Sequence, residues 1–376
     1  MKVLILSCNT GEGHNSTAAA IQETFLNQSV PCDIRDALAF LSKHTSEFIR
    51  WGHVFVYRYL PKLFGVGYRF EENHAPRFIT KKSARGADAL HSFICENGYD
   101  TVICVHVFAG LMMTAMRNTY DDTPPFYFVA TDYTCSPGVA ECQADVYFIP
   151  HPALAAEFEG CGVPADRLIA SGIPVKNAFC TSGGRTAARA ALQIPADSKM
   201  IMLSLGSMGC GPMKKITINL IEQLPPDVFL VVICGYNRRL YRQLESLRST
   251  RVRILGFTKR MPLYMDAADL FLTKAGGLST TEAIAKRLPM LYVDAIQGCE
   301  SHNRDFMLQH GITQCASNPD TLTAMVRACL DDPAQLNRQI DAMQRNFPSC
   351  GAAELCREVI SRHALDTKGV FHETRS

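Results

Sequence analysis

A glycine pair followed by a carboxylate is the feature of this sequence that bears most directly on chemistry. Residues 270–303 begin as an apolar strand, break at Gly276 and Gly277, and resume at Ser279 with a pattern that predicts a helix. Such a turn is an anion site, because free backbone N–H groups and the helix dipole both point at whatever lies over it. Glu282 is expected in the first turn of the helix, within reach of the same ligand. A phosphate that carries a hydroxyl-rich group, as a nucleotide-sugar does, satisfies both features.

Other polar or aromatic residues follow neighbouring strands in the same half of the chain. The segment L-S-L-G-S-M-G places Gly206 and Gly209 after an apolar strand, where the backbone could approach a pyrophosphate. Asn237 follows the next strand, and Phe257 follows another, where an aromatic ring could flank a base. Each feature alone also fits an ordinary strand-to-helix turn. Together they indicate a nucleotide site along the carboxyl edge of one sheet.

The first strand-to-helix turn of the chain, S-C-N-T-G-E-G-H-N-S, contains Gly11 and Gly13 but lacks the dinucleotide fingerprint G-x-G-x-x-G. His14 is expected where the helix begins, and a histidine there could act as a general base or bond its own loop. Asp132 follows another buried strand and could act as the base, orient His14 or cap a turn. No D-x-D motif follows a strand of the second half, so no metal ion is expected at the diphosphate.

Strands and helices alternate along the chain, which predicts an α/β fold with parallel, doubly wound sheets. A length of 376 residues favours two domains. The alternation breaks between Gly172 and Met200, so the boundary is placed near Cys180. The predicted domains are 1–180 and 181–350, followed by a C-terminal helix and polar tail over 351–376. The expected strands are 3–7, 101–105, 126–130, 146–149, 200–205, 229–234, 253–255, 270–273 and 290–293.

Composition narrows the class of protein. Hydrophobic residues make up 47% of the chain and charged residues 20%, which is typical of a globular protein. The formal net charge is only +2, which gives no support to a nucleic-acid-binding surface. The 15 cysteines show no C-x-x-C pair, and no secretory leader is recognised, so a cytoplasmic chain with reduced thiols is expected. The longest apolar stretch is too short for a membrane span, which leaves binding to one membrane face open.

Residues 44–82 interrupt the alternating pattern with aromatic and basic residues. They include Trp51, the only tryptophan, and run into the stretch 76–85, which contains Lys81, Lys82 and Arg85 and no acidic residue. Interleaved aromatic and basic side chains suit a surface that enters the headgroup region of an anionic membrane. A helical subdomain with an aromatic core is an equal alternative, and a single-stranded nucleic-acid surface is a weaker one.

The combination of motifs resembles the GT-B glycosyltransferases, in the group that contains bacterial diacylglycerol glucosyltransferases and plant monogalactosyldiacylglycerol synthases. The resemblance covers most of the chain. The segments that carry it are T-G-E-G-H-N-S at 10–16, V-A-T-D-Y at 129–133, S-G-I-P-V at 171–175, G-Y-N at 235–237, G-F-T at 256–258, T-K-A-G-G-L-S-T-T-E-A at 273–283 and E-S-H-N at 300–303.

The resemblance implies two Rossmann-like domains, an N-terminal one for a lipid acceptor and a C-terminal one for a UDP-sugar. His14 would stand at the acceptor hydroxyl, Phe257 near the uracil and Glu282 at the ribose hydroxyls. Glu300 and Asn303 would lie near the sugar. The residues implied at the diphosphate are Ser207, Met208, Gly209, Gly276, Gly277 and Leu278.

The activity implied by the resemblance is inverting transfer of a hexose, glucose or galactose, from a UDP-sugar to diacylglycerol, without a metal or other cofactor. The product would be a β-linked glycolipid made at the inner face of the membrane. Cys299 stands where relatives commonly have glutamine, which leaves the identity of the hexose open. The alternatives are a polyprenyl or other lipid acceptor, a non-catalytic UDP-sugar sensor, and a UDP-sugar 2-epimerase, which shares the fold.

Overall fold

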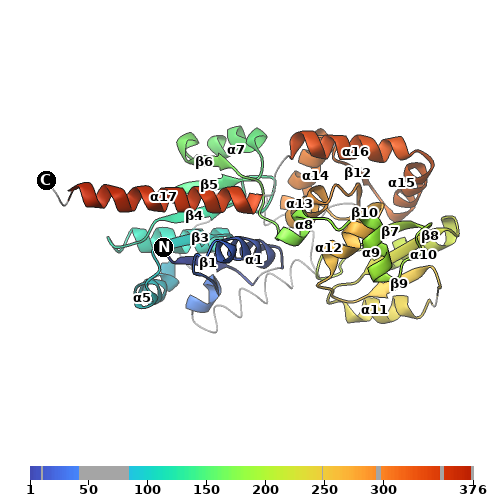
Figure 1. Cartoon of the computed structure of the whole chain (residues 1–376), viewed down its shortest axis with the longest axis horizontal. Coiled ribbons are helices and arrows are strands. Elements are labelled where there is room, and N and C mark those ends of the chain that lie inside the picture. The colour runs from blue at the N-terminus through green and yellow to red at the C-terminus, as the bar shows by residue number, and fades with distance from the viewer. Residues whose placement is uncertain (10–11, 42–83, 248, 294–297, 348–350, 374–376) are drawn as a thin grey trace. The chain divides into compact units, whose positions relative to one another are not determined.

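The chain divides into two compact units, each built on a six-stranded parallel sheet (Figure 1). The computed structural model describes residues 1–9, 12–41, 84–247, 249–293, 298–347 and 351–373. The first unit comprises Met1–Asn177 with Ser349–Ser376, and the second comprises Ala178–Pro348. The predicted α/β fold with two doubly wound sheets is confirmed.

In the first unit the strand order is β2-β1-β3-β4-β5-β6. The winding starts at β1, moves to β2 on one side, and then crosses to β3 on the other side. The strands are β1 (Val3–Ser7), β2 (Cys32–Asp36), β3 (Thr101–Cys104), β4 (Phe126–Val129), β5 (Val146–Ile149) and β6 (Leu168–Ala170). The α-helices are α1 (Glu12–Asn27), α5 (Ala87–Asn97), α6 (Val107–Arg117), α7 (Ala155–Gly160) and α17 (Gly351–Glu373).

The C-terminal helix α17 completes the core of the first unit. Its residues Leu355, Cys356 and Val359 are fully buried in one cluster with Ile21 and Phe25 of α1. Burial of apolar side chains between the two helices is the main stabilising contribution at this face of the sheet. The segment expected as a helix and polar tail over 351–376 is therefore a structural part of the first unit, and the helix continues to Glu373.

In the second unit the strand order is β12-β11-β10-β7-β8-β9. The chain winds from β7 through β8 to β9, returns to β10 on the other side of β7, and continues outward. The strands are β7 (Lys199–Leu203), β8 (Val228–Ile233), β9 (Val252–Leu255), β10 (Leu270–Thr273), β11 (Met290–Val293) and β12 (Thr313–Ala316). The α-helices are α8 (Asn177–Cys180), α9 (Arg185–Leu192), α10 (Met213–Gln223), α11 (Arg238–Glu245), α12 (Met261–Ala267), α13 (Gly277–Ala285), α14 (Cys299–Gln309), α15 (Pro319–Asp331) and α16 (Pro333–Asn346).

The nine expected strands are all present, and three further strands were not predicted: β2, β6 and β12. Each of the three is an edge strand of its sheet. Among the described residues, no helix combines the length and the apolar character needed to cross a bilayer. Among the described residues, thirteen cysteines carry free thiols, whereas Cys180 is disulfide-bonded, so the expectation of reduced thiols is wrong for Cys180.

Candidate functional site

The residues singled out from the sequence gather where the winding of each sheet reverses. In the first unit this point lies between β1 and β3, and in the second it lies between β7 and β10. Open α/β sheets bind ligands outside the carboxyl ends of the strands at such a point, because the connecting loops diverge there. His14 follows β1, and the glycine loop at Gly206 and the turn at Gly276 follow β7 and β10.

Backbone and hydroxyl groups hold the ring of His14. Its Nδ1 lies 2.9 Å from the carbonyl oxygen of Val105, directly after β3, and 3.1 Å from the hydroxyl of Thr131, after β4. A carbonyl oxygen only accepts hydrogen bonds, so Nδ1 carries the proton and donates it. In the neutral ring this leaves the lone pair on Nε2, the atom that can accept a proton from a ligand.

The electrostatics of His14 favour the neutral ring. Burial lowers the pKa of the imidazole, and the negative charge of Asp132 and the hydrogen bond to Val105 oppose this only partly. A histidine with a lowered pKa is unprotonated at neutral pH, as a general base must be. Asp132 thus acts on His14 through its charge, while Val105 and Thr131 orient the ring.

His106 is a neighbour of His14 that the sequence did not single out. The two rings meet edge to face with their centroids 4.7 Å apart. The Nδ1 of His106 accepts a hydrogen bond from the backbone N–H of Phe108 and so caps the N-terminus of α6. The signal available in the sequence was its position two residues after β3, at the start of the next helix.

A chain of hydrogen bonds anchors the start of α1 to the ends of β1 and β2. Ser7 donates to Asn15, Asn15 donates to Asn9, and Asn9 donates to Asp36, over distances of 2.7–2.9 Å. Near the same turn, a Cβ atom added at Gly13 would have no heavy atom within 4 Å. No described residue fills the space in front of this backbone segment, which a ligand could occupy.

The other residues expected at the acceptor and membrane side are only partly covered by the described structure. Arg85 is exposed in a short 3-10 helix, Ala84–Gly86, just before α5. Gly11, Trp51, Lys81 and Lys82 lie outside the described residues.

In the second unit, the loops after β7 and β8 interlock through their backbones. Gly209 and Gly235 both have φ of +56°. A Cβ atom at Gly209 would lie 2.1 Å from the carbonyl oxygen of Cys234, and one at Gly235 would lie 2.0 Å from that of Ser207. No side chain fits at either position, so both glycines are required by the packing of the loops themselves.

Asn237 fixes this arrangement. Its side chain accepts a hydrogen bond from Leu240 N–H, which caps α11, and donates one of 2.8 Å to the carbonyl oxygen of Gly209. The backbone N–H of Tyr236 donates to the carbonyl oxygen of Ser207 at 2.8 Å. Asn237 therefore holds the loop that contains Gly206, Ser207, Met208 and Gly209.

The helix α13 begins earlier than predicted. Gly276 is its N-cap residue and Gly277 its first residue, so Leu278 lies in the first turn and Glu282 in the second. The expectation that Glu282 lies in the first turn is wrong, because the extended Gly276 (φ −78°, ψ 132°) lets the helix start at once. The N–H groups of the first turn still lie at the carboxyl end of β10, as the anion site requires.

Two residues of α14 bind the turn that follows β10. The buried side chain of Asn303 donates a 3.0 Å hydrogen bond to the carbonyl oxygen of Ala275. Glu300 is 8% exposed and forms an ion pair with Lys274, which also packs close to Gly206. Lys274 thus connects the glycine loop after β7 to α14, a role that the sequence did not reveal. Cys299, the first residue of α14, is half-buried.

Two aromatic rings form an exposed platform at the ends of β8 and β9. Tyr236 and Phe257 stack with centroids 4.5 Å apart and an interplanar angle of 8°. They are 55% and 46% exposed, which is unusual for rings of this size. A flat exposed ring pair at the carboxyl edge is suited to stacking on a base. Phe257 was expected there, whereas Tyr236 was missed.

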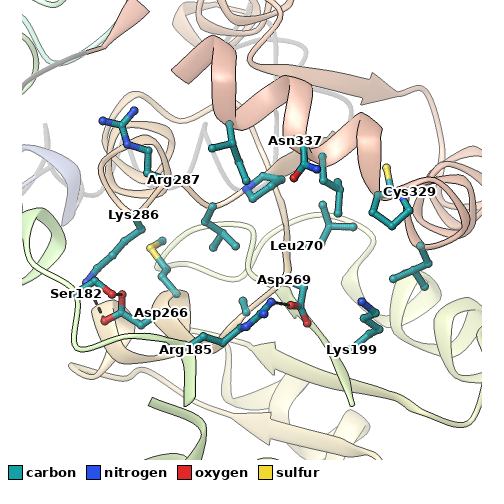
Figure 2. A pocket seen from close by; sticks show the side chains of 18 residues that line it. Ser182, Arg185, Lys199, Asp266, Asp269, Leu270, Lys286, Arg287, Cys329 and Asn337 are labelled. Atoms are coloured by element: carbon teal, nitrogen blue, oxygen red, sulfur yellow. Dashed lines mark hydrogen bonds and ion pairs between the residues drawn. The ribbon is translucent and has the colours of Figure 1, made fainter. Parts of the chain in front are cut away.

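A surface hollow of about 370 Å³ lies at the opposite edge of the second sheet (Figure 2). It is lined by residues at the amino ends of strands, including Lys199, Asp269 and Leu270. The carboxylate of Asp269 forms an ion pair with Arg185 at 2.5 Å, and that of Asp266 forms one with Lys286 at 2.9 Å. The acidic side chains of the hollow are thus paired with basic ones, and none of the site residues predicted from the sequence lines it.

Two protein families match the chain. Residues 14–175 match monogalactosyldiacylglycerol synthase, and residues 201–351 match the C-terminal domain of glycosyltransferase family 28. Among curated proteins, the chain is similar to two processive diacylglycerol β-glucosyltransferases. The one from Staphylococcus saprophyticus is 25% identical over 96% of this chain and 92% of that protein. The one from Bacillus mycoides is 22% identical over 91% of this chain and 89% of that protein.

Solved structures share the fold at low identity. MurG of Acinetobacter baumannii is 14% identical and superposes with a TM-score of 0.63 over 96% of this chain and 99% of that one. The spinosyn rhamnosyltransferase SpnG, complexed with thymidine diphosphate, superposes with a TM-score of 0.66 at 13% identity, over 96% of this chain and 100% of that one. The UDP-GlcNAc 2-epimerase of Neisseria meningitidis, bound to UDP-GlcNAc, superposes with a TM-score of 0.63 at 15% identity, over 96% of this chain and 100% of that one. The GT-B architecture of the chain is thereby established.

The interlocked loops predict a sharp difference between two glycine substitutions. Gly235→Ala should lower the free energy of unfolding by about 2–4 kcal/mol, because its Cβ overlaps the Ser207 carbonyl and its φ is positive. Gly183→Ala, where an added Cβ meets nothing within 4 Å, should change it by less than about 0.5 kcal/mol. Denaturant unfolding measures both, and equal stabilities would disprove the backbone contact.

Proposed function

Because the chain belongs to the GT-B glycosyltransferases of the monogalactosyldiacylglycerol synthase and processive diacylglycerol β-glucosyltransferase family, we propose that it transfers a hexose from a UDP-sugar to diacylglycerol with inversion. The hexose is glucose or galactose, and the product is a β-linked membrane glycolipid. The observation that carries the proposal is the unprotonated Nε2 of His14 at the switch point of the first sheet.

The donor occupies the carboxyl edge of the second sheet. Its diphosphate lies against the first turn of α13 and the loop after β7, where N–H groups and the helix dipole favour negative charge. Its uracil stacks on the ring pair of Tyr236 and Phe257. Glu282 contacts the ribose, and Glu300 and Asn303 lie beside the sugar, with Cys299 the residue that tunes the choice of hexose.

The reaction is a direct displacement at the anomeric carbon of the sugar. His14 accepts the proton of the acceptor hydroxyl at Nε2 while the hydroxyl oxygen forms a bond to that carbon. The bond from the carbon to the β-phosphate breaks, and the electron pair leaves with UDP. Attack on the face opposite the leaving group inverts the configuration.

Charge on the departing diphosphate is stabilised by the protein itself in this proposal. Backbone N–H groups of α13 and of the glycine loop are held in place before the reaction, so they need little reorganisation as charge develops. Lys274 adds a positive charge at the same edge, next to Gly206 and paired with Glu300. No metal ion is required for departure of the diphosphate on this scheme.

The acceptor side is the membrane-facing one. We assign residues 44–82, with Trp51, Lys81 and Lys82, and the neighbouring Arg85 to contact with an anionic membrane on its cytoplasmic face. The open backbone at Gly13 leaves space for the glycerol end of the acceptor beside His14.

An epimerase is the second candidate, since a UDP-GlcNAc 2-epimerase shares the fold. A different lipid alcohol, such as a polyprenyl lipid, is a third, and a non-catalytic UDP-sugar sensor is a fourth. The four differ in what happens to the sugar: transfer to diacylglycerol, isomerisation at C2, transfer to another lipid, or no change.

One assay separates transfer to diacylglycerol from the epimerase and the sensor. Purified protein is incubated with labelled UDP-glucose or UDP-galactose, with and without diacylglycerol vesicles, and label is followed into the organic phase. We expect a diacylglycerol-dependent β-glycolipid together with release of UDP. Labelled UDP-sugar converted to its C2 epimer without lipid product would identify an epimerase, and UDP binding without either product would identify a sensor.

His14→Gln should lower kcat by roughly 10²–10⁴-fold, because the general base is lost while the fold is kept. The pH profile of the wild type should show activity falling as pH drops through the lowered pKa of His14, with the acid limb below about 6.5. His310→Gln is the matched control, since His310 also bonds a backbone carbonyl through Nδ1 but lies at the end of α14. Wild-type turnover in His14→Gln would exclude the base assignment.

Tyr236→Ala should weaken UDP binding by about 1–3 kcal/mol, because the base loses one of two stacked rings. Isothermal titration with UDP measures the change directly and needs no acceptor. Leu308→Ala, which removes an exposed apolar side chain of 38% exposure elsewhere in the same unit, should leave the affinity unchanged. Unaltered UDP affinity in Tyr236→Ala would show that the platform does not hold the base.

A further inference from the structure

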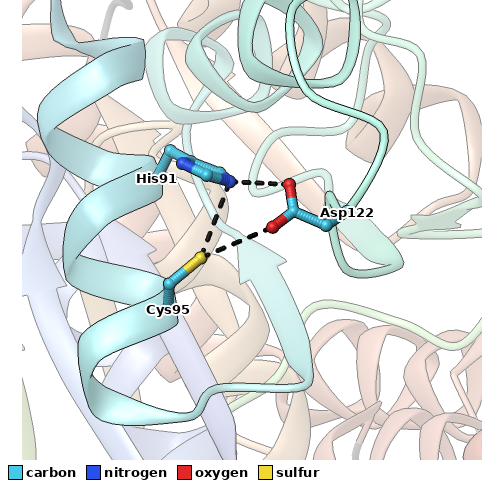
Figure 3. A group of neighbouring side chains, drawn as sticks. All are labelled: His91, Cys95 and Asp122. Carbon is cyan, nitrogen blue, oxygen red and sulfur yellow. Dashed lines mark hydrogen bonds and ion pairs between the residues drawn. The ribbon is translucent and has the colours of Figure 1, made fainter.

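Three side chains with metal-binding atoms converge on the surface of the first unit, outside the residues assigned above (Figure 3). His91 and Cys95 lie four residues apart on α5, so they share one face of the helix. Asp122 reaches them from the connection between α6 and β4. One ligand atom from each lies within 4.8 Å of the others. The sequence pattern does not reveal the group, because Asp122 lies 27 residues beyond Cys95 in the chain.

The geometry of the group is held by its surroundings. The ring of His91 stacks on Tyr120 with centroids 3.8 Å apart and an interplanar angle of 3°. The hydroxyl of Tyr120 donates a 3.0 Å hydrogen bond to Asp88, one turn earlier on α5. The backbone of Tyr120 is tied to the end of α6 by a 2.9 Å bond to Met116. The ring of His91 is therefore oriented before any ligand arrives.

We propose that His91, Cys95 and Asp122 form a binding site for a divalent transition-metal ion of the zinc class. Imidazole, thiolate and carboxylate are the ligands that zinc takes, and three protein ligands leave a fourth position for water. The site joins α5 to the α6–β4 connection.

The distances fit such an ion with a small adjustment. Ligand atoms around a tetrahedral zinc ion lie roughly 3.3–3.6 Å apart. The Sγ of Cys95 lies 3.5 Å from Nε2 of His91 and 3.8 Å from Oδ2 of Asp122. The Nε2 of His91 lies 2.7 Å from Oδ1 of Asp122. That pair must open by roughly 0.6 Å to admit the ion.

Binding replaces two protons by the metal ion. The Nε2–H of His91 donates to Asp122, which lowers the pKa of that carboxyl. Partial desolvation and the charge of Asp122 raise the pKa of the Cys95 thiol, so without a metal the sulfur is protonated. The ion binds the thiolate and the Nε2 lone pair. The thiol proton is released, and the imidazole exchanges its Nε2 proton for one on Nδ1, so the net release is one proton.

Cobalt(II) is the probe that reports the sulfur ligand. The whole protein is stripped with a chelator, kept reduced with a phosphine, and titrated with Co²⁺ while the thiolate-to-cobalt charge-transfer band is recorded. We expect the band to saturate at one equivalent and to disappear when Zn²⁺ is added. Cys95→Ser should abolish the band. Asp122→Asn should weaken Co²⁺ binding by at least roughly 10–100-fold, which is the cost of losing a residue that only supports a metal ligand.

Cys161→Ser is the control, because Cys161 is an exposed thiol beside Cys135 and could bind cobalt with it. It should leave the band intact. A band that survives in Cys95→Ser and is lost in Cys161→Ser would overturn the assignment, and so would absence of binding by the wild type. Zn²⁺ should also raise the Tm of the wild type but not that of His91→Gln. Equal shifts in the two proteins would show that His91, Cys95 and Asp122 are only a hydrogen-bonded cluster.

Discussion

The close approach of two backbone segments in the second unit determines where the donor site can be. Gly209 and Gly235 bring the loops after β7 and β8 into contact at carbonyl groups, with no side chain between them. This contact fixes the position of Gly206 beside Lys274, and Lys274 in turn forms an ion pair with Glu300. It also directs Tyr236 outward, where it stacks on Phe257. The proposed phosphate, sugar and base regions of the edge therefore all depend on one backbone contact.

The first unit uses a backbone carbonyl for a different purpose. The Val105 carbonyl fixes the proton on Nδ1 of His14 and thereby leaves Nε2 as the basic atom. Burial then keeps that atom unprotonated near neutral pH. Position, tautomer and charge state of the proposed base are thus set by the end of β3 and by the turn after β1. A parallel sheet brings these two segments together because β1 and β3 are neighbours.

The sequence predicted the buried central strands and the edge strand β9, and it missed the other three edge strands. All the central strands are apolar runs, because helices cover both of their faces. The edge strands β2, β6 and β12 carry exposed or half-exposed residues, such as Arg35 and Gln314, and resemble loops. The start of α13 was misplaced for a related reason: a glycine predicts a break, but Gly276 serves as the cap from which the helix begins. Local sequence patterns indicate burial and secondary-structure propensity, but they do not indicate which segments are neighbours in the folded protein.

The same limit applies to the sites. Residues in the turn after a strand or in the first turn of the next helix, such as Phe257 after β9 and His14 in α1, could be identified because their position relative to the strand is local. Tyr236 and His106 also follow strands but were missed, because each meets a ring from a distant part of the chain. The group of His91, Cys95 and Asp122 is the extreme case, since α6 and β3 separate its members in the chain. Chemistry that depends on such pairs becomes visible only once the sheet order is known, because that order brings distant loops to one edge.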